Sequence, residues 1–190
     1  MAEPEALTLK PGTGSWKPGD RAPDLHSMLR VDHAGEYGAT RIYAGQLAVL
    51  RGSSRAAHLV SHMASQEAAH LAKFEQLLTE RKVRPTLLQP LWHIGGFALG
   101  AATALISEKA AMACTDAVET EIDRHYEEQL VELGTSDPEL SADIRQFQAE
   151  EVEHRDTARE HGALEAPGYP LLSFAIRSVC KVAIAASKRL

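Results

Sequence analysis

Hydrophobic residues recur along most of this chain at intervals of three and four, the spacing that gives an α-helix one buried face. Helix-breaking residues interrupt the pattern at Gly52-Ser53-Ser54, at Arg84-Pro85, from Gly134 to Pro138, and from Gly162 to Pro170. Strand-like alternation is not evident between these breaks. We therefore predict an all-α protein with helices over about residues 24–50, 54–82, 87–106, 107–133, 138–161 and 171–188.

The helix starts carry capping residues. The Gly52-Ser53-Ser54 break can cap the second helix, and Ser136 or Asp137 is a plausible N-cap before Pro138 at the start of the fifth. Residues 1–22 are rich in Gly and Pro and lack both the apolar core of a secretion signal and the Arg-rich character of a transit peptide. We expect residues 1–22 to form a flexible lead-in and residues 23–190 to form one helical domain.

One motif occurs twice in the chain: a lone glutamate followed, about thirty residues later, by Glu-x-x-His. A helix presents residues i and i+3 on one face, so each pair can direct a carboxylate and an imidazole toward one centre. Two glutamates and two such pairs, each from a different helix of a four-helix bundle, are the ligands of di-iron carboxylate proteins. The first copy is Glu36, Glu67 and His70, and the second is Glu119, Glu151 and His154.

The positions of the turns between the helices place the two motifs at the same height along the bundle. Glu36 and Glu67 are equally far from the Gly52 turn, and Glu119 and Glu151 are equally far from the Gly134 turn. Each glutamate lies ~16 residues, or ~24 Å, from its turn at the rise of an α-helix. Two antiparallel hairpins therefore bring all the ligands to the middle of one bundle.

We predict that the glutamates of the Glu-x-x-His pairs bridge two irons, that the lone glutamates are terminal ligands, and that each histidine supplies one nitrogen. The competing interpretation is a set of solvated helix faces with ordinary ion pairs, and the duplicated spacing favours metal. We expect the neighbouring carboxylates to lie at the surface. They are Glu121, Glu127, Glu128, Glu150 and Glu153.

Four further side chains near the motifs are open to more than one interpretation. His33 either supports the site from outside the ligands or lies at the surface, and Asp116 either orients a ligand or is solvated. Tyr126 projects on the face of Glu119, two helical turns away, where it can hydrogen-bond in the site or line a substrate channel. Periodicity leaves His125, which lies well off that face, undecided.

No formal charge occurs between Arg84 and Glu108, but Pro90 and Gly95-Gly96 interrupt the apolar run, so we do not expect it to span a membrane. It is either a buried crossover between the hairpins or an apolar surface that rests in one leaflet. The last helix is apolar and basic, as expected for contact with an anionic membrane surface or with another subunit of a homo-oligomer.

Composition excludes some classes of function. The net charge of −6 argues against nucleic acid as the main partner. The two cysteines, Cys114 and Cys180, lie in apolar settings without metal-binding spacing, so we expect buried, reduced thiols and a reducing compartment.

Longer motifs point to one family. The segments Arg30-Val-Asp-His-Ala-Gly-Glu-Tyr-Gly-Ala39, Pro90-Leu-Trp92, Ala111-Met-Ala-Cys-Thr115 and His125-Tyr126 resemble those of the 5-demethoxyubiquinone hydroxylases of ubiquinone biosynthesis. The resemblance covers about residues 24–190. It implies a ferritin-like four-helix bundle of two hairpins, with an apolar crossover helix and a C-terminal amphipathic helix added. It also implies a di-iron centre on the six ligands already named, with no departure at any of them.

The resemblance further implies an O2-dependent monooxygenase that hydroxylates the ring of a polyprenylated demethoxyubiquinone precursor. It places His125 and Tyr126 in electron transfer or substrate positioning. It implies peripheral binding to an inner membrane, on the bacterial cytoplasmic or mitochondrial matrix side, and a lipid-binding partner protein of the same pathway. The sequence does not identify the external two-electron donor, which is a reductase, NADH or the reduced quinone substrate.

Two other classes of protein remain as alternatives. The first is a ferritin-type ferroxidase or iron-storage protein, which would use the same ligands but has no need of an apolar crossover. The second is a structural, membrane-associated helical module, which would need no metal.

Overall fold

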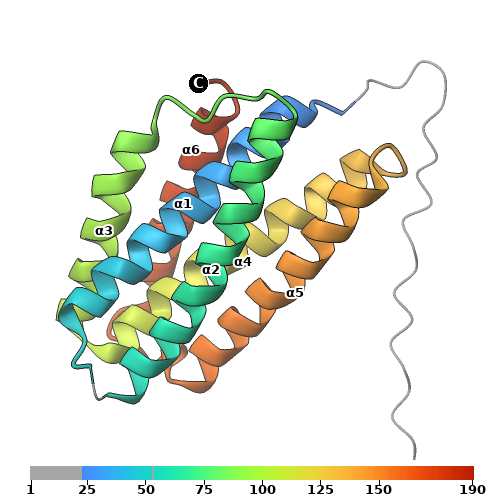
Figure 1. The fold of residues 1–190 in the computed structure, drawn as a ribbon. Helices are drawn as coiled ribbons and strands as arrows, with labels where there is room; N and C mark the ends of the chain where they lie inside the picture. The colour runs from blue at the N-terminus through green and yellow to red at the C-terminus, as the bar shows by residue number, and fades with distance from the viewer. Residues whose placement is uncertain (1–22, 53) are drawn as a thin grey trace, which may run out of the picture.

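The computed structural model describes residues 23–52 and 54–190 as an assembly of helices, with no strand in this part of the chain (Figure 1). The prediction of an all-α protein is confirmed, and the predicted helix boundaries are correct to within about two residues, the usual uncertainty of a helix end. The predicted lead-in over residues 1–22 lies outside the described residues, as does Ser53 of the first turn. The helices are α1 (Leu25–Val49), α2 (Arg55–Glu80), α3 (Gln89–Ile106), α4 (Glu108–Leu133), α5 (Pro138–Glu160), the short 3-10 helix η1 (Ala163–Glu165) and α6 (Tyr169–Ser187).

Side-chain caps fix where the helices begin. The Ser54 hydroxyl accepts a hydrogen bond from the Ala57 backbone N–H at 3.1 Å, so Ser54 is the residue of the predicted Gly52-Ser53-Ser54 break that caps α2. Of the two candidates before α5, Asp137 is the cap: its carboxylate accepts from the Leu140 N–H at 3.0 Å. Gly134 ends α4 with a φ of +53°, a conformation that glycine adopts with least strain. Both hairpin turns therefore lie where the spacing of the motifs requires them.

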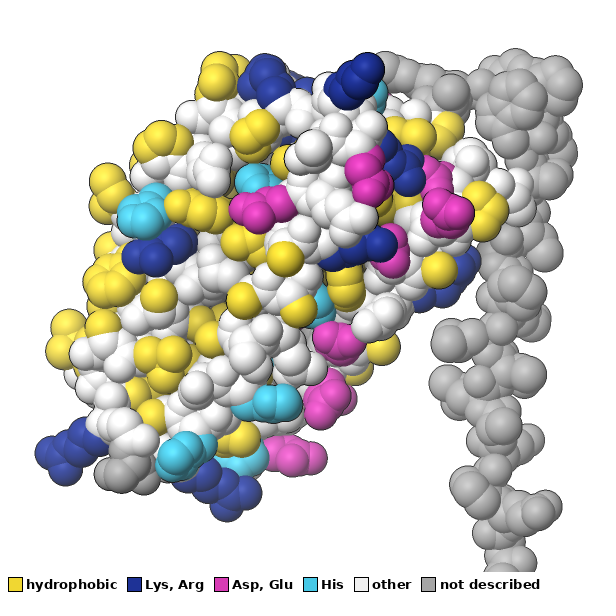
Figure 2. Space-filling view, viewed as in Figure 1, with side chains coloured by type: hydrophobic (Ala, Val, Ile, Leu, Met, Phe, Trp, Pro, Cys, Tyr) yellow, Lys and Arg dark blue, Asp and Glu magenta, His cyan; other side chains and the backbone are white. Residues whose placement is uncertain are grey.

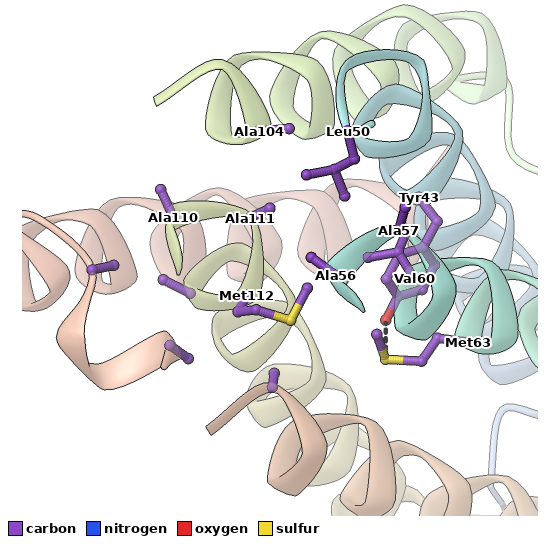
Figure 3. Close-up of a cluster of buried hydrophobic side chains, with 14 residues drawn as sticks. Tyr43, Leu50, Ala56, Ala57, Val60, Met63, Ala104, Ala110, Ala111 and Met112 are labelled. Atoms are coloured by element: carbon purple, nitrogen blue, oxygen red, sulfur yellow. Dashed lines mark hydrogen bonds between the residues drawn. The ribbon is translucent and has the colours of Figure 1, made fainter. Parts of the chain in front are cut away.

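The bundle consists of two hairpins, α1–α2 and α4–α5, with α3 packed on α1 and α6 packed on α4 (Figure 1). One hydrophobic cluster joins the C-terminal part of α1 to the start of α2 and α4, and includes Tyr43, Val60, Met63 and Met112 (Figure 3). A second cluster around Phe74 fills the opposite end. The ligand motifs lie between these two apolar regions along the helices. This is the ferritin-like arrangement that the resemblance implied.

Helices α1 and α3 approach so closely that their glycines cannot be replaced without movement. A Cβ atom added at Gly100 would lie 1.9 Å from the Ile42 carbonyl oxygen, and one added at Gly45 would lie 2.1 Å from the Phe97 carbonyl oxygen. Only the face of α3 toward α1 is covered in this way. The rest of the helix exposes apolar side chains, namely Leu91, Ile94, Leu105 and Ile106. The crossover is thus packed against the bundle on one side and apolar on its outer side.

Helix α6 is held to the bundle by buried carboxylates of α4. Asp116 accepts hydrogen bonds from Arg159 Nε and from the Tyr169 hydroxyl, both at 2.6 Å. Glu121 accepts from Arg177 Nε at 2.7 Å and also binds Arg124. The expectations that Asp116 is solvated and that Glu121 lies at the surface are wrong, because α6 and the end of α5 cover this side of α4. Ion pairs and hydrogen bonds compensate the cost of burying both carboxylates.

Several large apolar side chains are exposed on the surface, most of them on α3 and α6. Figure 2 shows them gathered on the side occupied by α3, whereas acidic side chains gather on the opposite side of this view. Helix α6 adds exposed Leu171, Phe174, Val179 and Val182. Among the described helices, only α6 is long and apolar enough to cross a membrane, with a mean hydropathy of 1.4. The α3 segment does not meet this criterion.

The two thiols are free. Cys114 is buried, as expected, and Cys180 is half-buried on α6.

Candidate metal centre

The two copies of the motif meet in the middle of the bundle as two overlapping groups of potential metal ligands. One group is Glu36, Glu67, His70 and Glu151, and the other is Glu67, Glu119, Glu151 and His154. Within each group, the ligand atoms all lie within 4.8 Å of one another. Glu67 and Glu151 belong to both groups, as expected of bridging ligands.

Each of four helices contributes to this cluster. Helices α1 and α4 supply the lone glutamates, and α2 and α5 supply the Glu-x-x-His pairs. His70 Nδ1 lies 3.1 Å from a Glu151 oxygen and 3.4 Å from a Glu36 oxygen. His154 Nδ1 lies 3.2 Å from oxygens of both Glu67 and Glu151. Both imidazoles therefore direct Nδ1 into the cluster and Nε2 away from it.

The burial of these groups indicates that a cation belongs among them. All six residues are at most 1% exposed. Eight of their atoms are buried without a hydrogen-bond partner among the described residues: both oxygens of Glu67 and Glu151, one oxygen each of Glu36 and Glu119, and both histidine Nδ1 atoms. An unpaired buried polar atom is costly, and an unpaired buried charge more so. Two divalent cations would neutralise the four carboxylates, and hard oxygens with imidazole suit iron. The residues thus fit a two-metal site.

Burial and the neighbouring charges shift the pKa values of the clustered groups in the metal-free protein. Burial, and then the charges of neighbouring carboxylates, hold the pKa of Glu67 and of Glu119 well above the ordinary value. Burial alone would lower the pKa of His70, but close contact of its ring with the Glu151 and Glu36 carboxylates raises it to about 11. Burial alone would raise the pKa of Glu151, but close contact of its carboxylate with the His154 and His70 rings lowers it to about 2. Metal binding must therefore displace protons from Glu67, Glu119 and His70, whose pKa values are raised.

An outer layer of hydrogen bonds orients the ligands. The Tyr43 hydroxyl donates to Glu119 at 2.6 Å, and the Tyr126 hydroxyl donates to Glu36. This confirms that Tyr126 can hydrogen-bond within the site. Tyr43 has the same role in the other half and was missed, although it lies seven residues after Glu36, as Tyr126 does after Glu119.

The outer nitrogens of the histidines also have partners. His70 Nε2 lies 2.7 Å from a Glu150 oxygen, and His154 Nε2 lies 3.1 Å from the Gln66 side-chain oxygen. With Nδ1 facing the cluster, each Nε2–H is the donor. The expectation that Glu150 is only a surface residue is wrong: its side chain is 27% exposed, and its carboxylate supports a ligand. Glu127, Glu128 and Glu153 are exposed, as expected.

His125 is buried beside the cluster but does not belong to it. Its Nε2 lies 3.3 Å from an oxygen of Asp32, which also accepts a hydrogen bond from Gln129 at 2.7 Å. Burial raises the pKa of Asp32 above its ordinary value, although contact with His125 lowers it. His33 is buried and stacks on Tyr37, and no hydrogen bond joins it to the ligands in the described part of the chain.

An apolar cavity of about 510 Å³ lies beside the ligand helices, lined by residues of α1, α3, α4 and α6. Gly35 and Val118 line it, and each immediately precedes one of the lone glutamates. Trp92 of α3 and Cys180 of α6 line other parts of its wall. Sequence periodicity did not predict this cavity, because it depends on how α3 and α6 sit on the bundle. Its volume is in the range of small-molecule sites.

Comparison with known proteins agrees with this geometry. Residues 23–187 match the family model described as ubiquinone biosynthesis protein COQ7. The 3-demethoxyubiquinol 3-hydroxylase of Rhodospirillum rubrum is 53% identical over 174 residues, covering 90% of this chain and 82% of that protein. The mitochondrial NADPH-dependent 3-demethoxyubiquinone 3-hydroxylase of Mus musculus is 51% identical over 166 residues (85% and 76% covered). The mitochondrial 5-demethoxyubiquinone hydroxylase of Saccharomyces cerevisiae is 44% identical over 188 residues (90% and 80% covered). The chain therefore belongs to the family of the ubiquinone biosynthesis protein COQ7.

Proposed function

We propose that this protein is a di-iron monooxygenase that hydroxylates the ring of 5-demethoxyubiquinol, using O2 and two external electrons. The observation that carries the proposal is the buried six-residue cluster together with an apolar cavity lined by Gly35 and Val118, which immediately precede its two lone glutamates. The relatives from Rhodospirillum rubrum and Saccharomyces cerevisiae are named as hydroxylases of demethoxylated quinones, which supports the same reaction.

Glu36, Glu67, His70, Glu119, Glu151 and His154 would hold the two irons. When bound, the metal pair supplies the redox chemistry by which one oxygen atom enters the ring and the other leaves as water. The protein positions its own groups for this reaction. Tyr43 and Tyr126 each hold one oxygen of a terminal carboxylate, which leaves the second oxygen directed at the metals. The apolar clusters at both ends of the site exclude water from it.

The cavity is the proposed site for the quinone ring and the first part of its polyprenyl tail. Its walls are almost entirely apolar, as a hydrocarbon chain requires. They include the residues that immediately precede Glu36 and Glu119 in the sequence. Two of its four walls, α3 and α6, expose apolar side chains on their outer faces. A tail that leaves the cavity between these helices would therefore enter an apolar environment. We also assign His125 to substrate positioning or electron transfer, next to Tyr126.

The exposed faces of α3 and α6 are the proposed membrane contact. Glu121 ties α6 to α4 through Arg177, so we place α6 along the bundle and in contact with one leaflet rather than across the bilayer. The site of action would be the inner membrane, on the bacterial cytoplasmic side or the mitochondrial matrix side. We extend the proposal to a lipid-binding partner protein of the same pathway, for which this apolar surface is available. We also keep the prediction that the protein forms a homo-oligomer.

A reduced nicotinamide is the proposed source of the two electrons, because the Mus musculus relative is named as NADPH-dependent. No Gly-x-Gly-x-x-Gly motif is present in this sequence, so the nicotinamide would bind without a dinucleotide-binding fold or act through a partner. The iron-storage alternative is not supported by the family. The cavity and the exposed apolar faces have no role in a water-soluble storage cage.

The decisive experiment uses protein loaded with ferrous iron, vesicles containing 5-demethoxyubiquinol, NADPH or NADH, and 18O2. Mass spectrometry should find one 18O atom in the hydroxylated ring. Glu67→Ala should abolish the reaction, and Glu153→Gln, an exposed carboxylate near the site, should leave it unchanged. Full activity of Glu67→Ala, or ring oxygen that comes from water, would refute the proposal. Mass spectrometry of copurified lipid would identify the bound quinone independently.

A further inference from the structure

We propose that the two metal positions are chemically inequivalent, and that Glu150 makes the position formed by Glu36 and His70 bind a divalent cation more tightly than the position formed by Glu119 and His154. Glu150 would act as a positioning residue through His70. The inference rests on the proposed metal centre, but it concerns a property that neither the ligand set nor the proposed reaction requires.

The two halves of the site are related by an approximate two-fold symmetry that extends beyond the ligands. Tyr43 and Tyr126 occupy equivalent places in the two halves, and each donates a hydrogen bond to the terminal glutamate of the other half. Gln66 and Glu150 are also equivalent, because each immediately precedes a bridging glutamate. Each of these two residues contacts the outer nitrogen of the histidine in the other half. The symmetry makes the two halves directly comparable.

At this pair of positions the halves differ in chemistry. His70 Nε2 faces a carboxylate of Glu150 at 2.7 Å, whereas His154 Nε2 faces the neutral amide of Gln66 at 3.1 Å. The second oxygen of Glu150 accepts a hydrogen bond from Gln146 at 3.1 Å, which holds the carboxylate in place. A charged acceptor at the outer nitrogen makes an imidazole a stronger electron donor to a metal, and such partners change metal affinity by roughly 10–100-fold.

A second pair of equivalent positions breaks the symmetry in the same direction. Asp32 precedes Glu36 by one helical turn, and the equivalent residue before Glu119 is Thr115. Gln129 donates to Asp32 at 2.7 Å, and its counterpart Gln46 lies 3.5 Å from the Thr115 hydroxyl. Both departures from symmetry thus place an additional carboxyl group on the side of the Glu36 position.

The test uses Co2+ as the probe and metal-free protein that has received one equivalent. Crystals of this sample give anomalous difference maps at the cobalt edge, from which the occupancies of the two positions are compared directly. In the native chain, the Glu36–His70 position should hold most of the metal. Two resolved binding steps, differing roughly 10–100-fold in dissociation constant, should appear in a solution titration with Co2+.

Three variants separate the proposed cause from other effects. Glu150→Gln gives both histidines an amide and should reduce the difference between the positions by about tenfold or more. The double variant Gln66→Glu with Glu150→Gln exchanges the two outer partners while it keeps the net charge, and it should move the higher occupancy to the Glu119–His154 position. Glu153→Gln removes an exposed charge near the site and should leave the native preference unchanged.

Equal occupancies in the native chain, or a preference that persists in the double variant, would overturn the inference and leave the proposed function intact. Failure of the native chain to bind any Co2+ at these positions would overturn both. Thermal unfolding by circular dichroism verifies that each variant is folded. If Gln66→Glu prevents folding, the occupancy ratio of Glu150→Gln alone decides the outcome, because the inference requires that this ratio fall.

Discussion

The close packing of α3 on α1 yields a prediction whose sign is fixed by geometry. Replacing Gly100 with Ala places a Cβ atom 1.9 Å from the carbonyl oxygen of Ile42, whereas real Cβ contacts are essentially never shorter than 3.0 Å. One helix must therefore shift by roughly 1 Å at a contact between two backbones, which no side-chain rotation can relieve.

Overpacking of this kind costs about 1–3 kcal/mol, and Ala recovers at most about 1 kcal/mol of helix propensity relative to Gly. A net loss of up to about 2 kcal/mol corresponds to a decrease in Tm of up to about 8 °C for a chain of this size. Gly95→Ala is the matched control on the same helix, because a Cβ atom there meets nothing within 4 Å. It should raise Tm by up to about 4 °C.

Thermal unfolding of the metal-free variants, followed by circular dichroism, measures both effects. Helix α3 supplies no ligand, so Gly100→Ala should still bind two Co2+ ions at 10 °C. A Gly100→Ala variant that is stabilised as much as Gly95→Ala, or a Gly95→Ala variant that is equally destabilised, would show that the two helices are not in backbone contact.

Three further outcomes are expected. Metal affinity should rise with pH, because the raised pKa values of Glu67, Glu119 and His70 favour protonated forms that a cation must deprotonate. Calorimetry in buffers of different ionisation enthalpy counts the protons released on binding. Release of no protons would contradict the assignment. Glu67→Gln should stabilise the metal-free protein in urea at pH 7 by about 1–3 kcal/mol. The gain should vanish below about pH 4, because a raised folded-state pKa costs stability only above the unfolded value, and a pH-independent gain argues against this cause. Phe174→Glu should abolish flotation with anionic liposomes without changing Co2+ binding, and retained flotation would locate the membrane contact elsewhere.

The sequence was sufficient to predict the helices and the clustering of the two motifs because the signals for both are local. Each Glu-x-x-His pair lies within one helical turn, and the Ser54 and Asp137 caps fix the start of their helices. The distance from each glutamate to its turn then places the two motifs at the same level. These relationships require no knowledge of how distant helices pack.

The errors arise where a distant helix covers a polar residue. Asp116 and Glu121 lie on a side of α4 that would be solvated in a four-helix bundle without α6, and their partners Tyr169 and Arg177 come from that helix. Glu150 projects away from the cluster, as its position in the helix indicates, but the outer nitrogen of His70 projects the same way and meets it. Periodicity gives the direction of a side chain and does not give what lies beyond it.

The exchange of outer partners between the hairpins bears on what a duplicated site can become. Two identical hairpins, paired as separate chains, would also bring six ligands together, but a mutation in the shared gene would change both outer positions at once. In this chain the hairpins are encoded separately and joined through α3, so residues 66 and 150 can diverge. Each hairpin sets the environment of the histidine that the other supplies. Covalent fusion thus allows each half of the site to evolve under constraints set by its neighbour.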